Sequence, residues 1–216
     1  MMKTVKIAAS VACWVSLLAV PMVVGCGEKA PPAPAAPKTD VPSAPSAAPA
    51  SAAAAAAGGA KRAVAKITTT SDGGITGSAS FTANGKDVEV ALELQNAPPG
   101  LHAWHIHDGT SCGREKQADG GMGGPGTAAG PHWNPGKMNH GLPTAKAHHA
   151  GDFGNFTADS SGKASAKLTT DAFNLDGTGD LSAIGHAVII HGGTDDGQGA
   201  NGDAGARVGC GIIEKQ

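Results

Sequence analysis

The clearest pattern of hydrophobic and polar positions lies between Lys86 and Gln95, where the two kinds of residue alternate. The apolar positions are Val88, Val90, Leu92 and Leu94, and the residues that alternate with them are Asp87, Glu89, Ala91 and Glu93. A period of two residues places successive side chains on opposite faces of an extended chain. The segment is therefore predicted to be a β-strand with one buried face.

Weaker β patterns surround this strand and are separated by turn sequences. The further predicted strands are 63–70, 75–82, 163–169 and 187–191. The turn sequences are Asp-Gly-Gly at 72–74, Ala-Asn-Gly at 83–85, Pro-Pro-Gly at 98–100 and Asp-Ser-Ser-Gly at 159–162. Short strands with this punctuation predict an all-β fold, a sandwich or a barrel.

Two long stretches, 108–152 and 192–207, have no periodicity and are dense in glycine. They hold many of the histidines and aspartates, and long loops in a compact domain are usually functional or disordered. The abundance of these side chains favours function.

Composition agrees with a loop-rich β domain. The chain has 216 residues, with 33 glycines, no tyrosine and only 3 % aromatic residues, which disfavours long helices. Sixteen basic and 18 acidic residues give a formal net charge of −2. Binding to a phosphate backbone needs a basic surface, so we expect no nucleic-acid partner.

The first 25 residues are predicted to be an export signal. Lys3 and Lys6 precede an apolar run over 7–24 that ends in Val-Val-Gly-Cys at 23–26. This ending resembles a bacterial lipobox, which predicts a lipid anchor at Cys26. Because Gly27 and not Asp follows, we expect an outer-membrane lipoprotein facing the periplasm or the cell surface. An uncleaved membrane helix is the alternative, since the run is near the minimum spanning length.

Residues 26–60 are mostly Ala, Pro and Ser. Such a segment has too little large apolar surface to offset its ordering entropy, so it is predicted to be a disordered tether to a folded domain at 61–216. The alanine run at 52–57 has a helix as its alternative reading, but Pro49 and two glycines border it.

Histidines supply the candidate chemistry. His105 and His107 are two residues apart, which on a strand places both imidazoles on one face. Such a pair alone more often consists of surface or core histidines than of metal ligands, but further candidates follow along the chain. They are His132, His140, His149, Asp152 and His191. Six histidines and one aspartate are enough ligands for two neighbouring metal sites.

Several of these residues stand in motifs that resemble those of the copper–zinc superoxide dismutases. The motifs are Gly-Leu-His-Ala-Trp-His-Ile-His at 100–107, Gly-Pro-His-Trp-Asn-Pro at 130–135, His-Ala-Gly-Asp-Phe-Gly-Asn at 149–155, Ile-His at 190–191 and Gly-Ala-Arg-Val-Gly-Cys-Gly at 205–211. The resemblance spans residues 63–213. It implies an eight-stranded Greek-key β-barrel and an enzyme that converts superoxide to O₂ and H₂O₂.

The resemblance also implies the metals and their ligands. Copper would be held by His105, His107, His132 and His191, and zinc by His132, His140, His149 and Asp152. His132 would bridge the metals and carry a proton to the product. Imidazoles around a redox metal suit copper, while three nitrogens and one carboxylate suit zinc.

Four further residues take roles by the same resemblance. Asp195 would join His105 to His140, and Arg207 would attract and orient the anion beside copper. Cys112 and Cys210 are expected to form a disulfide, since Cys13 lies in the signal and Cys26 is the predicted lipid site. The alternatives are an ordinary loop carboxylate for Asp195, a solvated side chain for Arg207 and two free thiols for the cysteines.

Other functions remain open at this point. The main alternative is a non-catalytic envelope lipoprotein that binds copper or zinc, and a structural lipoprotein is the third. The segment from Cys112 to His132 is longer, and that from Gly192 to Ala206 shorter, than in the eukaryotic members. A homodimer is possible, and these differences in length leave its geometry open.

Overall fold

The computed structural model of the protein describes residues 60–71 and 73–216. The predicted signal at 1–25, the lipid site at Cys26 and the predicted tether up to residue 59 lie outside the described residues. In the part that is described, no helix has the length and apolar character needed to cross a membrane.

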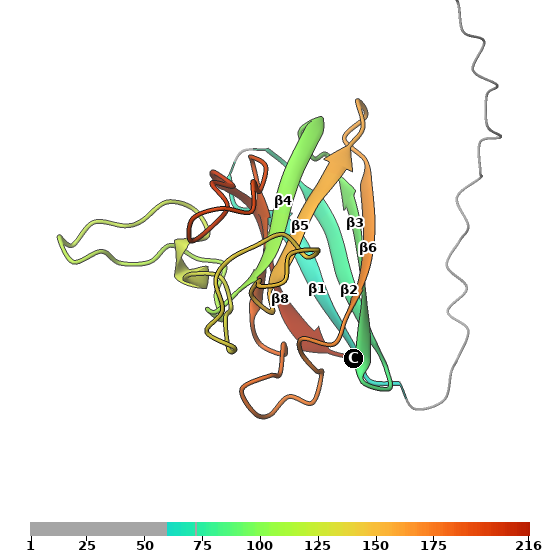
Figure 1. The fold of residues 1–216 in the computed structure, drawn as a ribbon. Coiled ribbons are helices and arrows are strands. Elements are labelled where there is room, and N and C mark those ends of the chain that lie inside the picture. Colours follow the sequence, from blue (N-terminus) through green and yellow to red (C-terminus); the bar gives the residue numbers. More distant parts are fainter. Residues whose placement is uncertain (1–59, 72) are drawn as a thin grey trace, which may run out of the picture. The chain divides into compact units, whose positions relative to one another are not determined.

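Eight antiparallel strands form a closed barrel in the order β1-β2-β3-β6-β5-β4-β7-β8 (Figure 1). Their bounds are β1 Arg62–Thr69, β2 Thr76–Asn84, β3 Asp87–Gln95, β4 Gly100–His107, β5 Asp152–Ala158, β6 Ala164–Thr170, β7 Ala187–His191 and β8 Arg207–Lys215. A short 3₁₀ turn, η1 Thr127–Ala129, is the one helical element among the described residues. The predicted all-β Greek-key barrel is confirmed.

The alternating pattern of β3 explains how the barrel is filled. Val88, Val90, Leu92 and Leu94 are all buried, whereas the glutamates between them are exposed. Inward side chains from the other strands complete one apolar cluster, which includes Phe81, Trp104, Ile190 and Ile213. The hydrophobic effect of this cluster fixes which face of each strand looks inward, and therefore which face looks toward the loops.

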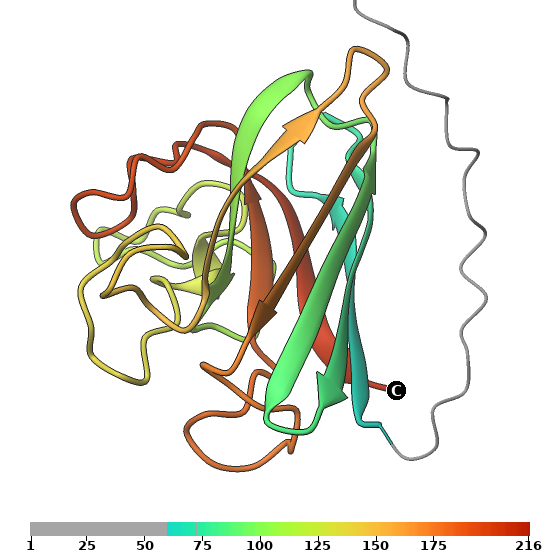
Figure 2. The ribbon, with the colours of Figure 1, turned by 45° about the vertical axis from the view of Figure 1, so that its right-hand side comes forward.

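Crossover connections pair strands that are distant in the sequence. β3 pairs with β6 and not with β4, while β4 pairs with both β5 and β7. Both long aperiodic stretches become loops, and they gather on one side of the barrel (Figures 1 and 2). The end of β4 at His107 thus lies opposite the start of β7 at Ala187 and beside the loop that contains His132.

The strand patterns in the sequence did not predict β4, β5 or β8, and the structure shows why. β4 ends in six consecutive buried residues, so no alternation marks it. β5 begins with two successive buried residues, Asp152 and Phe153, and continues with Gly154 at a φ of 71°, so no alternation appears. β8 contains Gly209 and Gly211, which have no side chains and therefore interrupt the alternation of apolar and polar positions. A Cβ on Gly211 would collide with the backbone carbonyl of Lys66, because β1 and β8 approach closely there.

Candidate metal centre

Strand β4 presents two histidines on one face of the sheet. Its residues alternate, so Trp104 and Ile106 join the apolar core while His105 and His107 lie on the opposite face. The loops cover that face, and all four side chains are buried. The apolar core of the barrel therefore sets the direction in which both imidazoles point.

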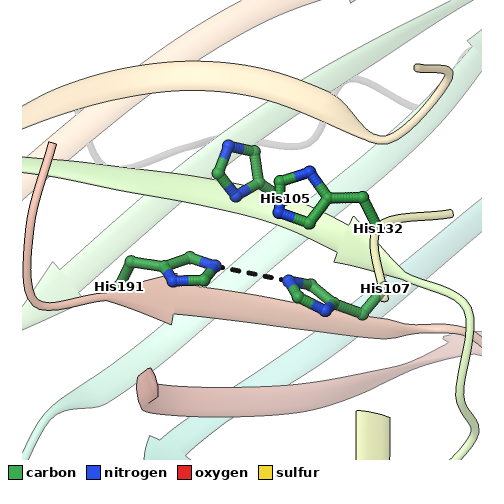
Figure 3. A group of neighbouring side chains, drawn as sticks. All are labelled: His105, His107, His132 and His191. Carbon is green, nitrogen blue, oxygen red and sulfur yellow. Dashed lines mark hydrogen bonds between the residues drawn. The ribbon is translucent and has the colours of Figure 1, made fainter. Parts of the chain in front are cut away.

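A neighbouring strand and a loop add two more histidines. β7 pairs with β4 and ends at His191, and an isolated bridge joins His132 to His107. The possible ligand atoms of His105, His107, His132 and His191 all lie within 4.8 Å of one another, and we call these residues the first set (Figure 3).

A second cluster shares one member with the first set. His132, His140, His149 and Asp152 also have ligand atoms within 4.8 Å of one another and are all buried; they form the second set. The Nδ1 atoms of His132 and His140 are each 3.0 Å from a carboxylate oxygen of Asp152, and Nδ1 of His149 is 3.2 Å away. Three imidazole nitrogens thus converge on one carboxylate.

In three histidines of the first set, one ring nitrogen already makes a hydrogen bond. The donors and acceptors are His105 Nε2 to Asp195 Oδ2 at 2.9 Å, His107 Nδ1 to the carbonyl of Gly130 at 2.9 Å, and His191 Nδ1 to the carbonyl of Gly205 at 3.3 Å. A neutral imidazole that donates from one nitrogen offers a lone pair at the other. His107 Nε2 and His191 Nε2 lie 3.3 Å apart, so two lone pairs face each other. A cation between them removes that conflict.

Buried nitrogens without partners show where cations fit. Among the described residues these atoms are His105 Nδ1, His132 Nε2, His140 Nδ1 and His149 Nδ1; the last two lie near Asp152 but make no hydrogen bond with it. A buried polar atom left unpaired costs about 1–3 kcal/mol, so four together call for a ligand. Tetrahedral zinc with bonds of about 2.0–2.1 Å holds its ligand atoms about 3.3 Å apart. In the second set the three nitrogens lie 3.0–3.2 Å from the oxygens of Asp152, and all ligand atoms lie within 4.8 Å of one another, which is compatible with that spacing.

The ionisation of the site suits metal binding. Burial lowers the pKa of His105 to about 4 and that of His191 to about 3, and it lowers the pKa of His107 well below its usual value. These imidazoles are therefore neutral at pH 7, which is the form that binds metals. Burial opposes ionisation of Asp152, but hydrogen bonds from His132 and from the backbone of His149 outweigh it and lower the pKa of that carboxyl.

Asp195 connects the two sets through hydrogen bonds. Its Oδ2 accepts from His105 Nε2 and its Oδ1 accepts from His140 Nε2, both at 2.9 Å. These bonds, together with one from the backbone N–H of Gly197, overcome the effect of burial and hold the pKa of Asp195 well below its usual value. Because both rings donate through Nε2, both present Nδ1 to their sets.

Arg207, the first residue of β8, lies beside the first set. Its Nη1 donates to the carbonyl of Gly126 at 2.7 Å and its Nη2 to the carbonyl of Gly130 at 2.6 Å. The guanidinium helps to line a cavity of about 280 Å³ together with His107, His132 and His191. A neighbouring hollow of about 370 Å³ also includes Arg207, but no histidine of the first set lines it. The cavity therefore joins a fixed positive charge to the first set.

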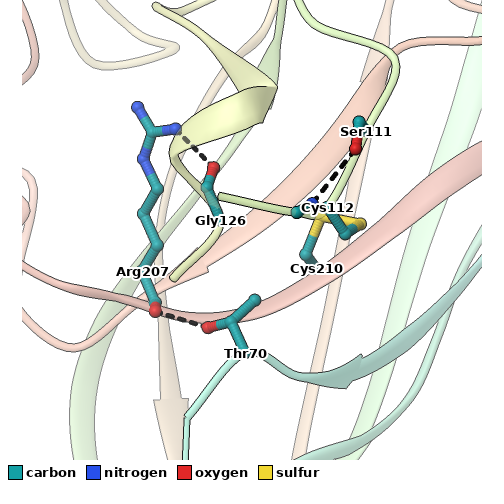
Figure 4. Close-up of a disulfide and its surroundings, with 7 residues drawn as sticks. Thr70, Ser111, Cys112, Gly126, Arg207 and Cys210 are labelled. Carbon is teal, nitrogen blue, oxygen red and sulfur yellow. Dashed lines mark hydrogen bonds between the residues drawn. A yellow bond between two sulfur atoms is a disulfide. The ribbon is translucent and has the colours of Figure 1, made fainter. Parts of the chain in front are cut away.

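The predicted disulfide is present and ties the loop after β4 to β8. Cys112 and Cys210 are bonded with a Cα–Cα distance of 5.7 Å and a separation of 98 residues (Figure 4). Closing a chain segment of this length stabilises a fold by about 4–5 kcal/mol in the chain-entropy model. The same loop supplies the Gly126 and Gly130 carbonyls, so the bond anchors the segment that positions Arg207.

Two residues of the site received no role from the sequence. Asn155 on β5 exchanges hydrogen bonds with the backbone of Asp195: its amide donates to the Asp195 carbonyl and its Oδ1 accepts from the Asp195 N–H, both at 2.8 Å. Gly202 packs over the same carboxylate, where a Cβ would collide with Asp195 Oδ1. Asn155 stood in one of the quoted motifs, but Gly202 had no distinguishing pattern around it.

The other histidines lie outside both sets. His102 packs on Phe156, and its ring nitrogens contact the backbone carbonyls of His191 and Pro98. His148 and His186 are partly exposed.

Known proteins match this chain closely. The family model described as copper/zinc superoxide dismutase matches residues 75–213. The extracellular superoxide dismutase [Cu-Zn] of Onchocerca volvulus is 34 % identical over 72 % of this chain and 76 % of its own length. The superoxide dismutase [Cu-Zn] of Botryotinia fuckeliana is 34 % identical over 69 % of this chain and 96 % of its own length. The superoxide dismutase [Cu-Zn] of Yarrowia lipolytica is 36 % identical over 70 % of this chain and 96 % of its own length.

A solved structure gives the same result for the fold. The crystal structure of the clock protein EA4 superimposes with a TM-score of 0.59 and 29 % identity, covering 71 % of this chain and 93 % of that one. The chain therefore belongs to the copper/zinc superoxide dismutase family. It is an enzyme whose substrate is superoxide and whose cofactors are copper and zinc.

The Asn155–Asp195 contact leads to a first prediction. Asn155→Ala removes both hydrogen bonds to the backbone of Asp195, so the carboxylate that orients His105 and His140 loses its anchor. Because partners behind metal ligands affect affinity by about 10–100-fold, we expect zinc to be released to a chelator at least ten times more readily. Asn174→Ala, on a loop away from the site, is the control and should release zinc like the wild type. Equal release by all three proteins would contradict this role.

Proposed function

We propose that the first set holds copper, that the second set holds zinc, and that His132 is shared between the two metals. The observation that carries this assignment is the set of four partnerless buried nitrogens, distributed over both sets. Four imidazoles suit a redox-active copper ion, while three imidazoles and one carboxylate suit tetrahedral zinc. When bound, copper supplies one-electron oxidation and reduction, and zinc supplies a fixed positive charge.

The reaction consumes two superoxide anions and two protons and yields O₂ and H₂O₂. In the proposal, one proton is carried by Nε2 of His132, a buried atom with no hydrogen-bond partner among residues 60–71 and 73–216. Nδ1 of the same ring lies 3.0 Å from Asp152 Oδ1, so the ring keeps its orientation while Nε2 takes up and releases the proton. Asp195 holds His105 and His140 in the tautomers that present Nδ1.

In the same proposal, Arg207 attracts and orients superoxide. Two backbone carbonyls fix its guanidinium in the cavity, and an arginine keeps its charge throughout the physiological pH range. A protein that only stored metal would need no fixed cation in the cavity beside the first set. Arg207 therefore supports turnover over the alternative of a metal-binding lipoprotein without activity.

The N-terminal assignments also belong to the proposal: a lipoprotein signal at 1–25, a lipid anchor at Cys26, a tether at 26–60 and the enzyme domain at 61–216. The lipobox-like sequence supports an outer-membrane lipoprotein of the bacterial envelope, facing the periplasm or the cell surface. The name of the extracellular relative from Onchocerca volvulus is compatible with export. A homodimer stays a prediction, which sedimentation of the purified chain would test.

Two substitutions separate the proposed metal sites. His140→Ala removes a ligand of the second set only, so zinc should be lost first while most copper stays bound. His107→Ala removes a ligand of the first set only, so copper should fall while zinc stays. Metal analysis of the purified proteins measures both. Retention of full zinc by His140→Ala would show that the second set is wrongly assigned.

The role of Arg207 is tested by substitution with alanine. Local charges in a cleft change association rates by about 10–1,000-fold, so Arg207→Ala should lower kcat/KM at least ten-fold while copper content stays unchanged. We also expect activity of the wild type to fall only gently with ionic strength, because the attraction is short-ranged. Arg62→Ala on β1 is the control. A steep dependence on ionic strength that persists in Arg207→Ala would place the attracting charges elsewhere.

The anchor is tested by Cys26→Ser. Without the thiol no lipid can be attached, so the variant should leave the membrane fraction and keep its superoxide dismutase activity in the soluble fraction. Fractionation of cells followed by an activity assay checks both parts. Unchanged processing and membrane attachment of Cys26→Ser would rule out the lipoprotein assignment.

A further inference from the structure

The cavity over the first set has two charged side chains of opposite sign in its wall. Arg207 lines it on one side, and Asp203, together with Asn201 and Ala204, also lines it. Asp203 is exposed to solvent, and no ion pair of the described residues joins it to Arg207. An approaching anion therefore meets an uncompensated carboxylate as well as the guanidinium.

The backbone holds Asp203 firmly at this place. On one side, the Gly202 carbonyl accepts from the N–H of Asp196 at 3.0 Å; on the other, the Ala204 carbonyl accepts from the N–H of Gly193 at 2.9 Å. Both neighbours of Asp203 are buried. Asp203 itself has a φ of 47°, in the left-handed region that aspartate and asparagine tolerate best after glycine. The carboxylate is thus attached to a fixed part of the cavity wall.

The charges along the same segment make Asp203 distinctive. From Gly192 to Ala206 the chain contains three aspartates and no lysine or arginine. Asp195 is buried between His105 and His140, and the carboxylate of Asp196 accepts a hydrogen bond from the N–H of Gln198 without lining the cavity. Asp203 is the one aspartate of this segment in the cavity wall.

We propose that Asp203 is a specificity-determining residue, which lets a univalent anion enter while it weakens the binding of more highly charged anions. Electrostatic energy is proportional to the charge of the anion. Arg207 alone would therefore favour a divalent anion over superoxide, and the opposing field of Asp203 reduces that preference. The inference rests on the proposed copper set and on Arg207 as the attracting group.

The size of the effect follows from the same proportionality. A unit charge at a solvated cavity mouth, within one Debye length of the anion, changes the affinity for a univalent anion by about two- to three-fold. For a divalent anion the factor is squared, which gives about four- to nine-fold. Removing the charge should therefore affect divalent anions distinctly more than univalent ones.

The test compares Asp203→Asn with the wild type as copper- and zinc-loaded full chains. Asparagine keeps the shape and tolerates the left-handed backbone, so the melting temperature should not change. Azide, a univalent probe, is titrated while the visible absorption of the copper is recorded, and sulfate, a divalent probe, is measured by competition with azide. We expect azide to bind about two- to three-fold and sulfate about four- to nine-fold more tightly to Asp203→Asn.

Asp196→Asn is the matched control, because it removes the same charge from the same segment outside the cavity wall. It should bind both anions like the wild type. Equal factors for azide and sulfate in Asp203→Asn, or equal changes in Asp196→Asn, would overturn the proposal. Failure of the wild type to bind copper, or unchanged azide binding in Arg207→Ala, would instead count against the proposed function on which it rests.

Discussion

Six buried imidazoles and two buried carboxylates lie within a few ångströms of one another in this protein, and the hydrogen bonds of Asp195 determine how they are arranged. Both oxygens of that carboxylate are occupied, one by His105 and one by His140. Each ring must donate through Nε2 and so turns Nδ1 toward its own set. Four buried nitrogens make no hydrogen bond among the described residues, so bound cations would stabilise the polar cluster.

The barrel provides what this arrangement requires. Alternation along β4 directs Trp104 and Ile106 into the core and two histidines to the other face, and the pairing of β4 with β7 brings His191 beside them. The loops complete the site because they are held in place. The Cys112–Cys210 disulfide anchors the loop whose carbonyls hold Arg207, and Asn155 attaches the loop of Asp195 to β5.

Much of this could be predicted from the sequence. The alternation around Val90 and Leu92 identified β3, and the spaced histidine motifs named every member of the two sets through the family they resemble. β4, β5 and β8 could not be found in the same way, because consecutive buried residues and glycines erase the period of two. The contacts that hold Arg207 use the carbonyls of Gly126 and Gly130, and backbone groups leave no mark in a sequence. The role of Gly202 was not predicted, because this glycine acts by lacking a side chain that would collide with Asp195.

The central claim is that His132 is a ligand common to both sets, and the most direct measurement replaces zinc by cobalt(II) in the copper-loaded protein. Two paramagnetic ions joined through one imidazolate are magnetically coupled, so the account predicts that the electron paramagnetic resonance signal of copper disappears as cobalt fills the second set. A copper signal of full intensity at one bound cobalt per chain would mean that His132 does not connect the two metals, and it would contradict the account.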